Sequence, residues 1–289
     1  MIKFTSLYSG SSGNCIFIGT ATTRILIDAG LSGISIINAL KSIGENPKDI
    51  NGILVTHEHS DHIKGVGILS RKFNIPIYAN QKTWERMDDS IGVVKDENRR
   101  IITKETKKPM QCSLFEYIDG ESVSYEECDF YRSFEIGDMG VSCYPTSHDS
   151  VEPVCYSLHI NNKKISVATD MGYVTDTVKE NIVGSDLLFI ESNHDVDKLK
   201  KGPYPWSLKR RILSNQGHLS NETAASFVAH NVQKGTTQVV LGHLSKENNV
   251  PHLAYDASLK SLESIGAVIG KDVILSVAKR EEVGEIVLL

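Results

Sequence analysis

The feature that most constrains this chain is a polar stretch that directly follows an apolar run. Ile53-Leu54-Val55 has the pattern of a buried strand, and the next seven residues are Thr56-His57-Glu58-His59-Ser60-Asp61-His62. Three imidazoles and a carboxylate within six positions are difficult to explain by packing, although a solvated polar loop is the alternative. Imidazole and carboxylate suit zinc, manganese or iron. His57 and His59 are spaced to face one cation, and Asp61 and His62 are better placed for a second.

Polar residues also follow apolar strands at other points of the chain. His148 comes soon after a strand ending at Tyr144, Asp170 follows Ser166-Val167-Ala168, and His243 follows Val239-Val240-Leu241. Asp28 similarly ends the run Ile25-Leu26-Ile27. Each alone is more typical of a hydrogen-bonded structural residue, but together they supply the ligands that the first loop lacks.

Composition narrows the class of protein. The chain has 289 residues, enough for a sizeable core, and its net charge of −5 argues against a broadly basic surface but not against a local basic groove. No apolar run approaches the length of a membrane span, and no signal peptide is visible at the N-terminus. Five cysteines without a CxxC pair favour reduced thiols. We therefore expect a cytoplasmic protein that does not enter a membrane.

The order of predicted elements indicates an α/β protein with one domain over residues 1–289. A charged stretch at about 85–128 breaks the pattern and is interpreted as an insertion packed over the domain edge. Asn161-Asn162 predicts a hairpin turn. The expected strands are 2–8, 15–28, 53–55, 75–79, 141–144, 154–160, 165–168, 187–190, 238–241 and 274–277, and the expected helices are 32–44, 63–73, 221–232 and 253–265.

The ordered polar set resembles the dinuclear form of the metallo-β-lactamase superfamily. The resemblance implies an αββα sandwich of two mixed β-sheets flanked by helices, with the metals at one edge. It also implies two divalent metal ions (zinc or manganese, with iron as a further option) that activate a hydroxide for attack. By position, His57, His59 and His148 would hold one metal, and Asp61, His62 and His243 the other. Asp170 would bridge them, and Asp28 would orient a ligand imidazole.

Within that superfamily, several features favour a phosphodiester substrate. A ligand cysteine and a C-terminal helical substrate domain are both absent from the sequence. The run Gln216 to Glu222 is similar to a segment of the tRNA-processing phosphodiesterases, which makes His218 a candidate general acid. Its alternative is a histidine bonded to backbone at the start of a helix. Glu191 is assigned to orient His218 or to contact the substrate.

Four segments together resemble the YycJ/WalJ (VicX) branch: residues 6–15, 191–195, 204–212 and 217–221. The branch implies a bacterial 5′ to 3′ DNA exonuclease, often encoded with a two-component system, and hence DNA ends as the partner. A basic segment runs from Lys198 to Arg211, where Tyr204 and Trp206 either stack an end base or are core aromatics. The predicted substrate contacts are Asn14, Asn193, Lys209, Arg210 and Arg211.

Two rival functions fit the same residues. One is a thioesterase or lactonase of the same fold, because this fold carries several hydrolytic activities. The other is a metal-binding accessory of a two-component signalling system, in which catalysis is incidental. The sequence leaves the oligomeric state undetermined.

Overall fold

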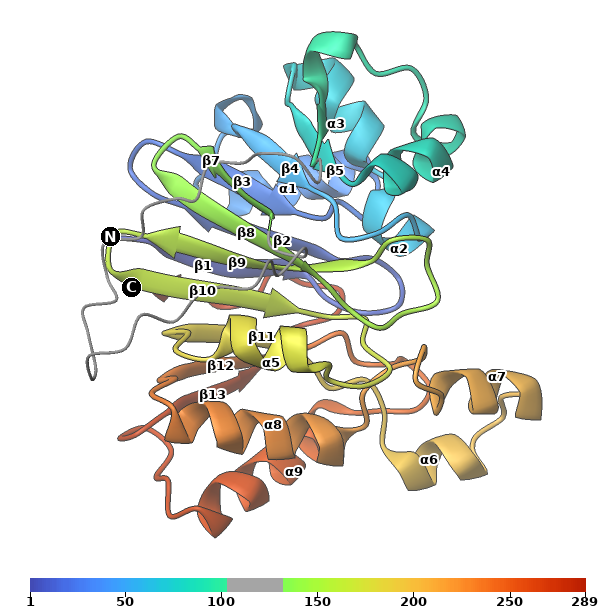
Figure 1. Cartoon of the computed structure of the whole chain (residues 1–289), viewed down its shortest axis with the longest axis vertical. Helices are drawn as coiled ribbons and strands as arrows, with labels where there is room; N and C mark the ends of the chain where they lie inside the picture. Colours follow the sequence, from blue (N-terminus) through green and yellow to red (C-terminus); the bar gives the residue numbers. More distant parts are fainter. Residues whose placement is uncertain (103–131) are drawn as a thin grey trace, which may run out of the picture.

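Two seven-stranded mixed sheets pack face to face in the computed structural model, which describes residues 1–102 and 132–289 (Figure 1). The first sheet has the order β14 (Val287–Leu288), β1 (Lys3–Tyr8), β2 (Cys15–Gly19), β3 (Arg24–Ile27), β4 (Gly52–Leu54), β5 (Ile77–Ala79) and β6 (Arg99–Ile101). The second has the order β13 (Ile274–Val277), β12 (Gln238–Gly242), β11 (Leu187–Glu191), β10 (Lys163–Ala168), β9 (Val154–Ile160), β8 (Met139–Pro145) and β7 (Arg132–Ile136). The predicted architecture of two mixed sheets is confirmed.

Helices cover the outer face of each sheet. On the first sheet lie α1 (Gly33–Ser42), α2 (Ser60–Ile63), α3 (Val66–Phe73) and α4 (Gln81–Ile91); on the second lie α5 (Asp176–Ile182), α8 (Asn221–Gln233) and α9 (Pro251–Ser264) (Figure 1). Two short helices, α6 (Val196–Lys201) and α7 (Trp206–Ile212), stand apart from these layers at one end of the molecule (Figure 1). None of the helices in residues 1–102 and 132–289 is long and apolar enough to cross a membrane.

Three apolar clusters correspond to the three interfaces of this sandwich. The central one joins the sheets and includes Phe4, Ile18, Leu158 and Phe189, all nearly inaccessible to solvent. The two outer clusters lie between each sheet and its helices. The central strands read as continuous apolar runs because both of their faces are covered.

Most predicted elements are present, and the differences have local causes. The hairpin between β9 and β10 turns at Asn161, which has the left-handed φ of 53° expected there. The helix expected at 63–73 begins later, as α3 at Val66, and the separate short helix α2 ends at Ile63. A Cβ on Gly65 would lie 2.5 Å from the Leu31 carbonyl oxygen, so the chain approaches its neighbour too closely there for another residue type.

The expected insertion at 85–128 begins too early. The helix α4 packs Trp84, Met87 and Ile91 against the first sheet, and β6 pairs in parallel with β5. Residues up to Ile102 therefore continue the main fold, and the breaks in apolar periodicity reflect an amphipathic helix and an exposed edge strand. The remainder of the predicted insertion, 103–128, lies outside the described residues.

The topology brings the predicted site residues to one edge. In the first sheet β3 and β4 are parallel, and in the second β10, β11 and β12 are parallel. Carboxyl ends of parallel strands meet at a common edge, which is where ligands bind in α/β sheets. Asp28, His57, Asp170, Glu191 and His243 lie at or just beyond these strand ends.

Candidate metal centre

Three of the polar strand-end residues have left-handed backbones. Asp28, Asp170 and His243 have φ values of 60°, 58° and 54°, uncommon for residues other than glycine. Such conformations cost free energy and cluster at functional sites. In each case the residue with this backbone conformation lies where the chain leaves the strand.

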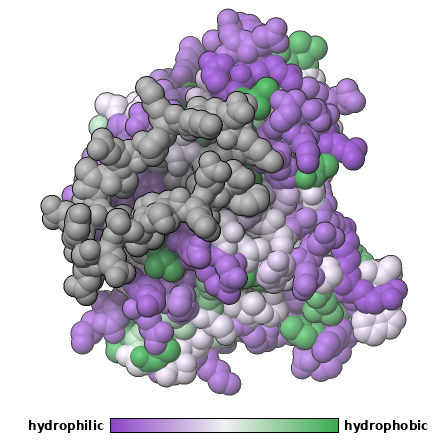
Figure 2. All heavy atoms as spheres, viewed as in Figure 1, coloured by the Kyte–Doolittle hydropathy of each residue, from purple (hydrophilic) through white to green (hydrophobic). Residues whose placement is uncertain are grey.

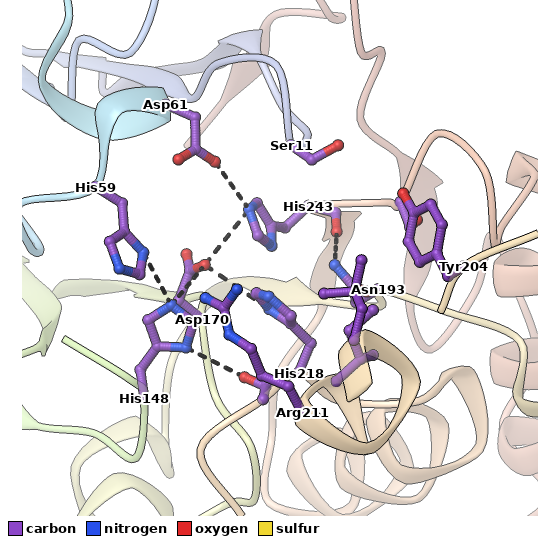
Figure 3. Close-up of a pocket in the computed structure, with 14 residues that line it drawn as sticks. Ser11, His59, Asp61, His148, Asp170, Asn193, Tyr204, Arg211, His218 and His243 are labelled. Atoms are coloured by element: carbon purple, nitrogen blue, oxygen red, sulfur yellow. Dashed lines mark hydrogen bonds and ion pairs between the residues drawn. The ribbon is translucent and has the colours of Figure 1, made fainter. Parts of the chain in front are cut away.

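The seven predicted ligands converge from both sheets. Figure 3 shows those that line the cavity, which are His59, Asp61, His148, Asp170 and His243. His57, His59 and His148 form one group, in which His59 Nδ1 lies 3.0 Å from His57 Nε2 and 3.3 Å from His148 Nε2. Asp61, His62 and His243 form a second group, in which Asp61 Oδ2 is 3.6 Å from His62 Nε2 and 3.9 Å from His243 Nε2.

Asp170 lies between the two groups. Its Oδ2 is 3.4 Å from His62 Nε2, and its Oδ1 is 3.5 Å from His243 Nε2 and 3.7 Å from His148 Nε2. A carboxylate in this position faces ligands of both groups, which is the geometry that a bridging ligand requires.

The donor set fits divalent cations. Ligand atoms about 2.0–2.2 Å from a tetrahedral zinc are separated from one another by about 3.3–3.6 Å, close to the spacings in both groups. His243 Nε2 and Asp170 Oδ2 are buried and have no hydrogen-bond partner among the residues that the structure describes. Buried polar groups usually have partners, so these atoms point to a ligand that completes them.

Each buried imidazole of the two ligand groups is held through its second nitrogen. His62 Nδ1 donates to Asp28 Oδ2 at 2.7 Å, and His148 Nδ1 donates to the Gly217 carbonyl at 3.2 Å. His57 Nδ1 is 2.9 Å from Thr56 Oγ1, which itself donates to Asp28. These partners select the tautomer whose Nε2 faces the cluster, as is usual for metal-binding histidines. Asp28 thus contacts His62 and Thr56 on the side away from the cluster.

The electrostatics favour positive charge between the two groups. Burial by itself lowers the pKa of His62, but Asp170 and Asp28 raise it to about 9. The pKa of Asp61 is held well below its usual range despite burial, by His243 and His62. Burial and neighbouring imidazoles lower the pKa of His57, so its lone pair is available to a cation. The carboxylates accordingly supply the negative charge that a divalent cation balances.

His218 lies beside this cluster but is tied to a different partner. Its Nδ1 is 2.7 Å from Glu191 Oε1, and the same oxygen is 2.8 Å from His243 Nδ1. Glu191 is completely buried, and its other oxygen accepts from the amides of Met171 and Leu219. Although burial opposes ionisation, the two imidazoles hold the pKa of Glu191 well below its usual range. One ionised carboxylate therefore orients both a ligand of the cluster and His218.

A cavity of about 220 Å³ opens over the cluster. Of the predicted substrate contacts, Asn193 and Arg211 line it (Figure 3). The Asn193 side chain also donates to the His243 carbonyl at 3.0 Å. Arg210 is exposed but lies outside the cavity lining.

Two predicted substrate contacts are placed differently. Lys209 is buried, and its ammonium donates to the carbonyls of Lys200 and Gly202, at 2.7 and 2.8 Å. Asn14 is buried outside the cavity lining, with its amide nitrogen 3.1 Å from His62 Nε2 and its oxygen accepting from Gly10 N. The Lys209 ammonium and the Asn14 oxygen thus bond within the protein, and neither residue lines the cavity.

Tyr204, expected either to stack an end base or to be a core aromatic, lines the cavity. Sequence reasoning missed Ser11 and Ser245, which also line it, and Asp149, which forms an ion pair with Arg211 through Nε. The signal for Asp149 is its position next to His148 in the sequence, whereas nothing in the sequence marks Ser245.

The αββα sandwich and its edge cluster of imidazoles and carboxylates define a metal-dependent hydrolase of the metallo-β-lactamase fold. The family description "Beta-lactamase superfamily domain" matches residues 23–244, and the chain belongs to this family.

Curated relatives extend over nearly the whole chain. It is 40% identical over 270 residues to "Exodeoxyribonuclease YycJ" of Bacillus anthracis, covering 93% of this chain and 92% of the relative. It is 39% identical over 272 residues to "Exodeoxyribonuclease WalJ" of Streptococcus pneumoniae, covering 93% and 91%. The crystal structure of the metallo-β-lactamase fold protein YhfI from Bacillus subtilis superposes with a TM-score of 0.67 at 15% identity, covering 99% and 100%. This last likeness concerns the fold alone.

Proposed function

We propose that this chain is a phosphodiesterase that uses two divalent metal ions, zinc, manganese or iron, to hydrolyse DNA from its ends in the 5′ to 3′ direction. The full-length similarity to two proteins named exodeoxyribonucleases supports the DNA substrate. The direction of hydrolysis rests on the sequence resemblance to the same branch. We place the protein in the cytoplasm, in accord with three buried free thiols at Cys15, Cys143 and Cys155.

The observation that carries the proposal is His218 in the cavity wall, held by Glu191 beside the metal ligands. A sugar alkoxide is a poor leaving group and needs a proton as the phosphorus–oxygen bond breaks. A thiolate leaves more easily, because thiols have a pKa of about 8.5. A positioned histidine outside the two proposed ligand groups is therefore better explained by phosphodiester than by thioester hydrolysis.

The roles of the side chains follow from their contacts. His57, His59 and His148 would hold one metal, Asp61, His62 and His243 the other, and Asp170 would bridge. Such metals, when bound, lower the pKa of water and stabilise anionic charge on the substrate. Glu191 accepts from His218 Nδ1, which leaves Nε2 to deliver a proton to the departing oxygen. Arg211 and Asn193 in the wall are positioned to donate to phosphate oxygens.

A substrate panel tests the reaction class. The purified protein, supplied with zinc or manganese separately, is assayed on end-labelled duplex and single-stranded DNA, on RNA, and on thioesters and lactones. We expect stepwise release of nucleotides from DNA ends. Turnover of a thioester or lactone with no cleavage of any nucleic acid would overturn the proposal.

Replacement of His218 tests the assigned acid. We expect His218→Gln to lower kcat on DNA by about 10²–10⁴-fold, the usual contribution of a positioned acid, with metal content unchanged. Turnover of a p-nitrophenyl phosphodiester should fall much less in the same variant, because its leaving group needs no proton. The exposed His230 provides the matched control, His230→Gln. A loss of bound metal in His218→Gln would show that His218 is a ligand instead.

A further inference from the structure

The two short helices that stand apart from the sandwich carry an excess of positive charge. We define the α6–α7 arm as residues 195–216. It contains six Lys or Arg residues and two Asp residues, a formal charge of +4, whereas the whole chain carries −5. The remainder of the chain therefore carries −9, so positive charge is concentrated on this one projection.

The arm also forms one wall of the cavity. Tyr204, Leu208, Arg211 and Ile212 line it from this side, so the arm begins where the reacting group would sit. The cavity, at about 220 Å³, is smaller than the roughly 300–1,000 Å³ typical of sites that enclose a whole ligand. A polymer whose end occupies it must continue over a neighbouring surface.

The arm presents its charges to solvent on a fixed scaffold. Lys198, Lys200, Lys201 and Arg210 are exposed, and only Lys201 has a nearby acidic partner, Asp197 at 3.8 Å, among the ion pairs of the described residues. The buried Lys209 joins the end of α6 to α7 through the Lys200 and Gly202 carbonyls. Hydrophilic side chains cover much of this projection, with some apolar ones among them (Figure 2).

One large aromatic side chain is exposed on the same arm. Trp206, the first residue of α7, is 66% exposed, and the Lys209 ammonium lies 5.6 Å from its ring centre. An exposed indole among cations is the combination that single-stranded nucleic-acid sites use for stacking beside phosphate contacts.

We infer that the α6–α7 arm is the docking surface for the nucleic-acid strand that leads away from the reacting end. The inference rests on the proposed function and adds where the rest of the polymer binds. Lys198, Lys200, Lys201 and Arg210 contact phosphates without reading sequence, and Trp206 stacks on an unpaired base. The arm governs affinity for long substrates, whereas the chemistry stays in the cavity.

The test removes three charges that lie outside the cavity lining. The arm variant carries three substitutions: Lys198→Ala, Lys200→Ala and Lys201→Ala. The control variant removes three lysines that are also exposed but lie at the end of α8, on α9 and in the loop after α9: Lys234→Ala, Lys260→Ala and Lys271→Ala. Binding of a labelled duplex with a single-stranded overhang and nuclease-resistant phosphorothioate linkages is followed by fluorescence anisotropy over a range of salt concentrations. Turnover of a p-nitrophenyl phosphodiester is measured in parallel.

We expect the arm variant to raise Kd by about tenfold or more at low salt. The slope of log Kd against log salt should fall by about 2 to 3, because each neutralised phosphate adds about 0.7–0.9 to that slope. Small-substrate turnover should be unchanged in both variants. Trp206→Ala should weaken binding of the overhang substrate more than that of a blunt duplex. Equal DNA binding by the two triple variants would overturn the inference. A wild-type protein that cleaves no nucleic acid would instead refute the proposed function.

Discussion

Asp28 holds the first histidine loop from behind the candidate metal groups. Its Oδ1 accepts from Thr56 N, and its Oδ2 accepts from Thr56 Oγ1 and His62 Nδ1, at 2.7–2.8 Å. The carboxylate is therefore surrounded by donors. It fixes the first histidine loop by accepting from the backbone of Thr56 and from the ring of His62. An amide has only one oxygen with which to satisfy the same donors.

We expect Asp28→Asn to weaken metal binding by about 10–100-fold while the fold is retained, the effect typical of partners behind the ligands. Titration against a chelating dye measures the affinity, and thermal unfolding of the metal-free protein checks the fold. Asp256→Asn, at an exposed position on α9, is the control. Unaltered metal affinity in Asp28→Asn would mean that the loop is held by other contacts.

The sequence predicted the identity of these residues better than their conformation. Strand-end position and residue type brought together Asp28, Asp170 and His243, because those signals are local. The left-handed φ of each could not be predicted, because Asp and His adopt this conformation more often than most residues but still at only a minority of their positions. The hydrogen bonds that Lys209 and Asn14 form within the protein could not be predicted either, because they depend on which loops contact each other in the folded chain.

At the scale of elements, long apolar runs were predictable and short amphipathic pieces were not. Strands such as β10 and β12 are buried on both faces, so composition alone marks them. The helix α4 has only four buried positions in eleven residues, and β6 is an exposed edge strand, so both were assigned to an insertion. The helices α6 and α7, with six and seven residues, are too short to show a helical period.

Contacts between loops decide how the elements present the ligands. A Cβ on Gly30 would lie 1.6 Å from the Asp61 carbonyl oxygen, and Asn14 N donates to that same oxygen at 2.8 Å. Ser9 Oγ accepts from His243 N at 2.7 Å. The Ser9–Asn14 loop thus contacts the backbone of two residues of the second candidate metal group, Asp61 and His243. This gives the glycine- and serine-rich sequence a structural reason that is independent of substrate.

At the scale of the molecule, each candidate metal group draws ligands from both sheets. His57 and His59 come from the first sheet and His148 from the second, while Asp61 and His62 are completed by His243. The N-terminal and C-terminal halves already share the central apolar core. A bound cation would add a connection between the two sheets at the edge of the sandwich. At this edge the apolar core ends and the loops are polar.

Removal of the metals should therefore destabilise the whole sandwich and not one loop. A ligand present at 100 times its Kd stabilises the folded state by about 2.7 kcal/mol. For 289 residues this corresponds to a Tm change of about 4–5 °C, because the entropy of unfolding is about 2.1 cal/mol/K per residue. Calorimetry with and without chelator measures this difference. His148→Ala and His243→Ala should each reduce the Tm difference between metal-bound and metal-free protein, because each removes the ligand that the second sheet gives to one metal group. The control His252→Ala, at an exposed position on α9, should leave this difference unchanged. A chelator-independent Tm in the wild-type protein would show that the cations do not link the two sheets, and would leave the sandwich to be held by its apolar core alone.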